Sequence, residues 1–236
     1  MPNESWSGER FWVDIIEKKL YPPEAIVLPE AVNELIKNKN FQGKDVLDYG
    51  CGTGRFGKLV QDKGANVIGI DISKEILKVA SKVIKVKHAN GTNLPFENCS
   101  FDYVLSFMIL HVIEDLEKAL HEICRVLKPE GKFLLGIVHP FSEKWDIKTG
   151  LAMQDNSTYH NIEKRSWVFN LTDDRRFSET YTHRPIEYYF NLFSKFFAVK
   201  RLLEPKLPSS YNNNKKYARI EYLIMELVKK TEGEYY

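Results

Sequence analysis

An acid and three glycines near residue 50 form the pattern with the clearest chemical meaning in this chain. Residues 45–57 read DVLDYGCGTGRFG, in which a short apolar run ends at Asp48 and glycines follow at alternate positions, Gly50, Gly52 and Gly54. Glycines after a strand let the backbone turn tightly and leave no Cβ where a ligand must approach. The spacing differs from the G-x-G-x-x-G of dinucleotide sites. An acid just before the first glycine also suits a ligand that carries positive charge.

A second acid lies where a nucleoside site needs one. Residues 66–70 (NVIGI) have the pattern of a short apolar strand, and Asp71 ends it, 21 residues after Gly50. An acid at about this distance can accept hydrogen bonds from both hydroxyls of a ribose that lies across the strand ends. The alternative is that Asp71 only caps the helix expected from Ser73. Because the acid follows a glycine loop, the spacing favours ribose binding.

These motifs and three later segments resemble the class I S-adenosylmethionine-dependent methyltransferases. Residues 48–54 resemble the family's acid-x-Gly-x-Gly-x-Gly motif, and Asp71 resembles its ribose-binding acid. The later segments, in the family's order, are 90–96 (NGTNLPF), similar to the segment that packs on the adenine, 100–106 (SFDYVLS), similar to the fourth strand, and 122–133, similar to the helix, turn and fifth strand that follow. The likeness covers about residues 44–138, and its five motifs occur in order.

The resemblance implies S-adenosylmethionine as cofactor, with S-adenosylhomocysteine as product. The residues that it implies for cofactor binding are Asp48, Gly50, Cys51, Gly52, Gly54, Asp71, Ile72, Asn90, Gly91, Ser106 and Phe107. Asp48 has two possible roles, to favour the positive cofactor or to hold the loop by bonding backbone amides. Asn90 replaces the family's common Asp; its side-chain oxygen can still bond the adenine amino group, but a negative charge is lost.

Composition limits the partners of the chain. Its 236 residues are 43% hydrophobic, and 34 basic and 32 acidic residues give a net charge of +2. This balance gives no general attraction to nucleic acid, which usually requires a clustered basic face. The three cysteines show no paired spacing and predict reduced thiols in a cytoplasmic protein. There is no signal peptide at Met1, and no apolar run approaches the roughly 18 residues of a membrane span. We therefore expect a small-molecule acceptor and leave the oligomeric state open.

Alternating strand and helix patterns must position these motifs. The strands expected are 45–49, 66–70, 83–87, 102–107 and 132–138, and the helices are 55–63, 73–82 and 115–127. Such alternation predicts a parallel sheet with helices on both faces. Right-handed crossovers then bring Gly50, Asp71, Asn90 and Ser106 to one edge, where open sheets bind ligands. With the resemblance, the expected fold is a Rossmann-like α/β sheet of seven mostly parallel strands, with an antiparallel last strand and a lid inserted after strand five.

Four segments are expected along the chain. Residues 1–40 form an amphipathic helical cap, in which Trp12 and Tyr21 either line the pocket or cover core, and residues 41–138 form the cofactor-binding core. Residues 139–184 show no clear period, and an interruption of this length is usually a lid, a binding loop or a small separate element. Residues 185–236 complete the core with a helix (185–197) and two strands (198–203 and 219–228).

The acceptor site is less clearly marked. Methyl transfer needs a nucleophile in line with the methyl–sulfur bond and exclusion of water, and a hydroxyl or charged amine also benefits from a general base. His139, directly after the fifth strand, is one candidate base and equally a buried histidine bonded to backbone. Tyr181 and His183 are further candidates from the irregular segment. His111 is expected to support its loop. No metal site is predicted, since Asp173–Asp174 is the only tight acidic pair nearby.

The acceptor atom stays open among oxygen, nitrogen and carbon. The aromatic residues of 139–197 could line a ring-shaped pocket, form a cage for an amine, or simply make the core of the lid. Two other functions compete with methyl transfer. A nicotinamide-dependent oxidoreductase shares the strand–glycine–helix–acid order, but the glycine spacing, Asp48 and residues 94–96 disfavour it. A non-catalytic S-adenosylmethionine-binding protein fits the sequence as well, because the acceptor site is unmarked.

Overall fold

Seven strands form one mostly parallel sheet in the computed structural model, which describes residues 9–21, 23–141, 158–170, 176–205 and 221–231. The strands are β1 (Asp45–Tyr49), β2 (Asn66–Asp71), β3 (Lys85–His88), β4 (Phe101–Phe107), β5 (Leu127–Val138), β8 (Phe197–Leu203) and β9 (Tyr222–Lys229), in the spatial order β3-β2-β1-β4-β5-β9-β8. All pairs from β3 to β5 are parallel, and β9 is antiparallel to both β5 and β8. The predicted α/β fold with seven mostly parallel strands and an antiparallel last strand is confirmed, whereas the lid after strand five stays a prediction.

Helices cover both faces of this sheet. They are α1 (Glu9–Glu17), the π-helical turn η1 (Pro23–Val27), α2 (Leu28–Ile36), α3 (Arg55–Gln61), α4 (Lys74–Ala80), α5 (Leu116–Val126) and α6 (Ile186–Phe193). Apolar residues of α2, α3 and α4 share one core cluster with one face of the strands, and those of α5 and α6 share the cluster on the other face. Alternation within β1 divides its side chains between the clusters, since Val46 belongs to the first and Leu47 and Tyr49 to the second.

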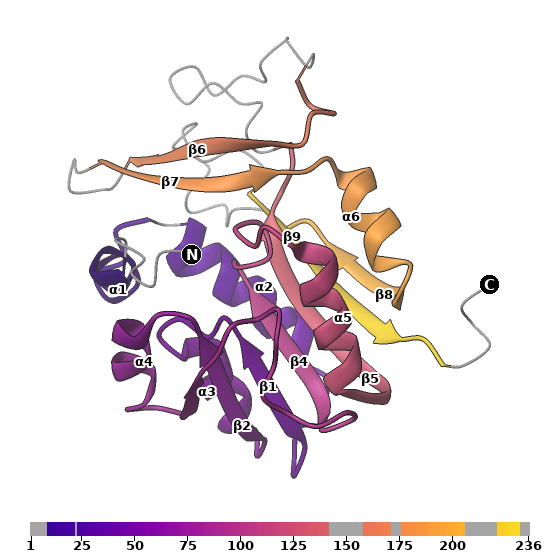
Figure 1. The fold of residues 1–236 in the computed structure, drawn as a ribbon. Coiled ribbons are helices and arrows are strands. Elements are labelled where there is room, and N and C mark those ends of the chain that lie inside the picture. Colours follow the sequence, from indigo (N-terminus) through magenta and orange to yellow (C-terminus); the bar gives the residue numbers. More distant parts are fainter. Residues whose placement is uncertain (1–8, 22, 142–157, 171–175, 206–220, 232–236) are drawn as a thin grey trace.

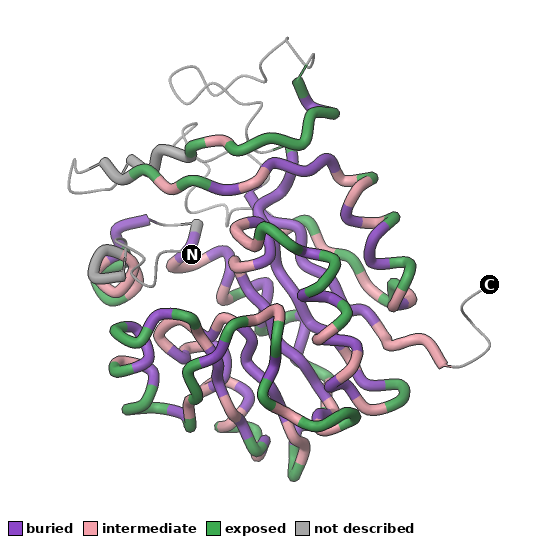
Figure 2. The backbone as a smooth tube through the Cα atoms, in the orientation of Figure 1, coloured by how far each residue is buried: buried purple, intermediate pink, exposed green. Residues whose placement is uncertain are grey.

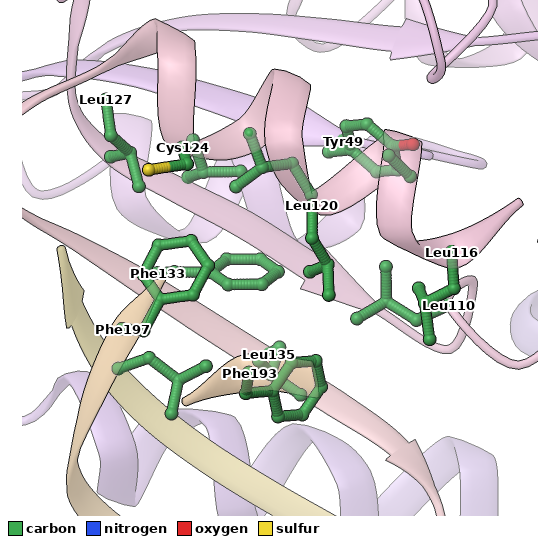
Figure 3. Packing of buried hydrophobic residues seen from close by; sticks show 14 of the residues in the cluster. Tyr49, Leu110, Leu116, Leu120, Cys124, Leu127, Phe133, Leu135, Phe193 and Phe197 are labelled. Atoms are coloured by element: carbon green, nitrogen blue, oxygen red, sulfur yellow. The ribbon is translucent and has the colours of Figure 1, made fainter. Parts of the chain in front are cut away.

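The second cluster is shown at close range in Figure 3. Leu120 and Cys124 of α5 lie above β5, and Phe133 of β5 packs against Phe197 at the start of β8, with ring centroids 5.5 Å apart. Phe193, at the end of α6, lies beside Leu135 of β5 in the same cluster. The central strands are buried along their length (Figure 2), which is expected for a parallel sheet covered on both faces.

The predicted strands match these elements to within a few residues, and the largest difference is at β5; residues 219 and 220, the predicted start of the last strand, lie outside the described residues. The fifth strand begins at Leu127, five residues before the expected start at 132, because Leu127 already pairs with Phe101 of β4. The register then shifts, the chain turns at Glu130 with a φ of 58°, and regular pairing resumes from Lys132. The Lys-Pro-Glu-Gly sequence, which predicts a turn, therefore lies inside the strand as an irregularity.

The segment after β5 contains a β-hairpin that the sequence analysis did not resolve. Strand β6 (Glu163–Asn170) pairs with β7 (Arg176–His183) in a separate antiparallel sheet. Figure 1 shows this hairpin lying across one end of the main sheet, from the side of α1 to that of α6. It is anchored to the loop after β4: the Thr182 amide donates to the His111 carbonyl at 2.9 Å, and the Arg184 guanidinium donates to two carbonyls of the same loop.

Within the described ranges, no helix has the length and apolar character needed to cross a membrane.

Candidate functional site

A cavity of about 510 Å³ opens at the carboxyl edge of the sheet. Its floor comes from the loops that follow β1, β2 and β4, and its walls come from α1, η1 and the inner side of β7. A shallower hollow of about 410 Å³ lies at the opposite edge, where β1, β2 and β3 begin, and includes none of the glycine loop. The chemistry predicted from the sequence therefore belongs to the first cavity.

The glycine loop turns off β1 with its backbone facing the cavity. Gly50, Gly52 and Gly54 have φ values of 69°, 53° and 80°, in the left-handed region that other residues rarely adopt. A Cβ added to Gly50 would lie 2.7 Å from the Ile109 side chain, whereas one added to Gly52 would meet no protein atom within 4 Å. Because Gly52 also lines the cavity, its open side is where a ligand can approach the backbone.

Asp48 joins the end of β1 to the start of α3. Its carboxylate is 3% exposed and accepts a hydrogen bond of 2.9 Å from the amide of Gly57. Burial raises the pKa of Asp48 to about 7; the Gly57 amide opposes the rise, the charge of Asp71 adds to it and that of Arg55 opposes it. This contact supports the second of the two predicted roles, holding the loop through a backbone amide.

Asp71 ends β2 beside the glycine loop and also lines the cavity. One carboxylate oxygen accepts from the Gly52 amide and the other from the Ser73 amide, both at 3.0 Å. The cap of α4 is Ser73, whose hydroxyl accepts from the Ile76 amide at 3.1 Å, so the helix does not need Asp71 for this role. A carboxylate oxygen can accept more than one hydrogen bond, so these two contacts are compatible with a bond from a sugar hydroxyl.

The other residues predicted for the cofactor divide into two groups. Cys51, Ile72 and Phe107 line the cavity together with Asp48, Gly50, Gly52 and Asp71. Gly54, Asn90, Gly91 and Ser106 do not line it. The Asn90 side-chain oxygen accepts from the amide and the hydroxyl of Thr92, both at 3.0 Å, which fixes a local turn. Gly91 lies against the Tyr49 hydroxyl, where a Cβ would collide, and Ser106 is fully buried within β4.

Burial also determines whether the Cys51 thiol could act as a nucleophile. Desolvation raises the pKa of the Cys51 thiol well above its ordinary range, and the charges of Asp48 and Asp71 raise it further. The thiolate is therefore suppressed, and Cys51 serves as a small residue in the loop.

Of the three predicted catalytic residues, only Tyr181 lines the cavity. His139 is 3% exposed; its Nδ1 accepts from the Phe141 amide at 3.1 Å, so its Nε2 carries the proton and donates to Glu204 at 3.0 Å. Burial lowers the pKa of His139, against the effect of Glu204. Both ring nitrogens are therefore engaged: Nε2 links the end of β5 to the loop after β8, and Nδ1 fixes the turn that follows β5. His183 is buried, and its Nε2 bonds the Tyr159 carbonyl at 2.8 Å.

Residues 47–135 match the model of a methyltransferase domain. These residues form a methyltransferase domain. The predicted family, enzyme class and cofactor are confirmed at the level of this domain.

Three relatives illustrate how far the likeness extends. An uncharacterised protein of Methanocaldococcus jannaschii is 37% identical over 158 residues, which are 66% of this chain and 61% of the relative. A demethylmenaquinone methyltransferase of Clavibacter sepedonicus is 36% identical over 100 residues, 39% of this chain and 40% of that protein. The chain thus spans less than two thirds of these curated relatives. The crystal structure of a Listeria monocytogenes protein assigned as an S-adenosylmethionine-dependent methyltransferase superposes with a TM-score of 0.74 at 21% identity, covering 89% of this chain and 100% of that one.

The methyltransferase domain fits S-adenosylmethionine at the cavity edge. The open side of Gly52 admits a ligand to the loop backbone, and the Asp71 carboxylate, which lines the same cavity, can accept hydrogen bonds from a ribose. Bound there, the cofactor would supply a methyl group on a positively charged sulfur. Asp71 and the glycine loop would hold its nucleoside, and α1 and β7 form the opposite wall of the cavity.

Several residues that line the cavity were not predicted, and most of them lie outside the matched domain. Glu24 of η1, Arg55 of α3 and Glu179 of β7 line the cavity, as does Tyr222 of β9. His111 also lines the cavity, although the sequence predicted that it supports its loop. Its carbonyl does accept a hydrogen bond from β7, so His111 contributes both to the anchoring of the hairpin and to the lining of the cavity. Two roles were predicted for Trp12 and Tyr21, to line the pocket or to cover the core. The structure agrees with the first, since both residues line the cavity. Residues 178–183 (SETYTH) show no apolar alternation, so the sequence held no signal that Glu179 would line the cavity.

Proposed function

We propose that this protein is an active methyltransferase that transfers the methyl group of S-adenosylmethionine to an oxygen, nitrogen or carbon atom of a small molecule. One observation carries the proposal. A single cavity joins the glycine loop and Asp71 to a second wall, built from α1 and β7, which belongs to segments outside the matched domain. Such a cavity has room for an acceptor beside a cofactor, and its two walls come from different segments.

The same arrangement supports the predicted division of the chain. Residues 1–40 would act as a cap and residues 139–184 as a lid over the core at 41–138, which residues 185–236 complete. The likeness to a demethylmenaquinone methyltransferase supports a small-molecule acceptor. The cytoplasmic location predicted from Cys51, Cys99 and Cys124 stays a prediction.

Calorimetry with S-adenosylhomocysteine tests cofactor binding directly. Asp71→Ala should weaken the affinity at least about tenfold, since a hydrogen bond to a charged group contributes about 1.5–3 kcal/mol. Asp62→Ala is the matched control, because this acid is 61% exposed at the end of α3 and does not line the cavity. An unchanged affinity in Asp71→Ala would remove the ribose assignment.

Methyl transfer itself separates an enzyme from a non-catalytic binding protein. Incubation of the full chain with methyl-labelled S-adenosylmethionine and a small-molecule cell extract should label an extract component. The Asp71→Ala variant is the control for background labelling. If S-adenosylhomocysteine binds but no extract yields a labelled product, the binding-protein alternative is favoured.

A further inference from the structure

The cavity has an acidic excess that the cofactor does not balance. Among its described lining residues are four carboxyl groups and one guanidinium. The guanidinium, on Arg55, pairs with the Glu24 carboxylate and also donates to the Glu24 carbonyl at 3.1 Å, and its charge acts on Asp48 as well. S-adenosylmethionine carries one net positive charge. Full ionisation of the four acids would therefore leave capacity for a further cation.

Glu179 is the acid whose position the fold does not explain. Along β7, Ser178 and Thr180 are exposed, whereas Tyr181 and His183 are buried, so Glu179 lies on the inward side of the strand. The inward side of such a hairpin normally carries apolar residues, because a buried carboxylate without a cation is destabilising. No ion pair joins Glu179 to a residue in the described part of the chain.

The surroundings of Glu179 favour the protonated, neutral form of its carboxyl group when no cation is bound beside it. Burial raises the pKa of Glu179 to about 8, the neighbouring Glu24 carboxylate raises it further, and the indole of Trp12 opposes the rise. A cation beside the carboxyl group would stabilise the ionised form. Binding of a cation near neutral pH is therefore coupled to release of a proton from this site.

A second, independent observation points to a ligand in the same cavity. His111 lines it and is 6% exposed, yet its Nδ1 has no hydrogen-bond partner among the described residues. Burial lowers the pKa of His111 to about 4, with a contribution from the charge of Arg184, so the ring is neutral near pH 7. A buried polar atom without a partner is unfavourable, and a ligand that contacts His111 can relieve this cost.

Aromatic side chains complete the environment. Trp12, Tyr21, Tyr181 and Tyr222 line the cavity with the two glutamates, and the ring of Tyr181 meets that of His111 edge-on at 6.2 Å. Aromatic rings and carboxylates together are the surroundings that proteins use to bind ammonium groups. A neutral hydroxyl would gain little from the charge of either glutamate.

We propose that the methyl acceptor is an amine, bound as its ammonium form between Glu179 of β7 and Glu24 of η1. This inference rests on the proposed function and specifies its acceptor class. Glu179 also takes the proton that the ammonium must lose. The freed nitrogen lone pair then forms a bond to the methyl carbon as the carbon–sulfur bond breaks, and the electron pair of that bond stays on sulfur. The products are an N-methylammonium, S-adenosylhomocysteine and protonated Glu179, so charge and atoms balance.

A matched pair of probes tests the cation site without knowledge of the natural acceptor. The full chain, saturated with S-adenosylhomocysteine, is titrated by calorimetry with 2-phenylethylamine and with its neutral counterpart 2-phenylethanol. We expect the amine to bind at least about tenfold more tightly than the alcohol. The heat of amine binding at neutral pH should vary with the ionisation enthalpy of the buffer, because the site releases a proton.

Glu179→Gln should abolish both the amine preference and the buffer dependence, and it should leave S-adenosylhomocysteine affinity within about twofold. Glu187→Gln is the control, since that side chain is 64% exposed on α6 and does not line the cavity; it should change neither. Equal affinities for amine and alcohol in the wild type would overturn the inference. So would a loss of S-adenosylhomocysteine affinity in Glu179→Gln, because the carboxylate would then serve the cofactor's own amino group. Failure of the wild type to bind S-adenosylhomocysteine would instead contradict the proposed function.

Discussion

Replacing Asp48 with asparagine should change how the stability of this protein depends on pH. The side chain is 3% exposed, and burial raises its pKa from an ordinary 3.8 to about 7. The folded protein therefore holds this proton more tightly than the unfolded chain does. As pH rises from 3.8 to 7, the unfolded chain loses the proton first, so the free energy of unfolding falls, and the loss is complete above pH 7.

The size of this effect follows from the same pKa. A rise from 3.8 to about 7 corresponds to about 4 kcal/mol, at 1.36 kcal/mol for each pH unit. Asparagine has no proton to lose and keeps an oxygen that can accept from the Gly57 amide. The stability of Asp48→Asn relative to the wild type should therefore improve with pH, by at most about 4 kcal/mol between pH 4 and pH 8.

Urea unfolding followed by tryptophan fluorescence, repeated across this pH range, measures the difference. Other titrating groups cancel because both proteins contain them. Asp62→Asn is the control, since its exposed carboxyl should give a difference that does not vary with pH. A difference between Asp48→Asn and wild type that stays within about 0.5 kcal/mol at every pH would show that Asp48 is hydrated and ionised, and would refute the reasoning from burial.

Two further pairs of variants test the glycine loop and its support. Gly52→Ala and Gly43→Ala both place a Cβ at positive φ with no protein atom within 4 Å, so urea unfolding should show a similar loss of about 1–2 kcal/mol for each. Only Gly52→Ala should also weaken S-adenosylhomocysteine binding in calorimetry; an equal effect of Gly43→Ala would contradict a ligand at Gly52. Tyr49→Phe should leave thermal stability unchanged or raise it by up to about 1 kcal/mol, because the buried hydroxyl has no partner among the described residues. Gly91→Ala should be destabilising in the wild type and less so in Tyr49→Phe, since its Cβ would collide with that hydroxyl; equal costs in the two backgrounds would disprove the contact.

Sequence patterns predicted the central sheet because its strands are short, apolar and separated by helical periods. The strand predicted over 45–49 matches β1, and the helix predicted over 55–63 contains α3 at 55–61. The start of β5 could not be predicted, because its pairing to Phe101 crosses a Pro-Glu-Gly turn that normally ends a strand. Here tertiary pairing to β4 overrides the local signal.

The cofactor side of the cavity was predictable for a similar reason. Gly50, Gly52 and Asp71 lie at strand ends, where topology alone brings them together. Asn90 and Ser106 lie at the same edge but do not line the cavity, since the Asn90 oxygen is held in a local turn and Ser106 is buried within β4. Strand order predicts the edge that a residue reaches, whereas the direction of its side chain depends on packing that the sequence does not reveal.

The residues proposed for the acceptor side could not be predicted from the sequence, because polar residues occupy inward positions there. In β7, the inward positions include Glu179 and His183, and a polar residue at a core position breaks the apolar alternation by which a strand is recognised. Conflicts of this kind between local pattern and fold are expected at functional sites. Glu179 lies on the side of β7 that lines the cavity, and burial there raises its pKa to about 8. Its carboxyl group is therefore expected to ionise when a cation binds beside it, which couples the proposed choice of an amine to the release of a proton.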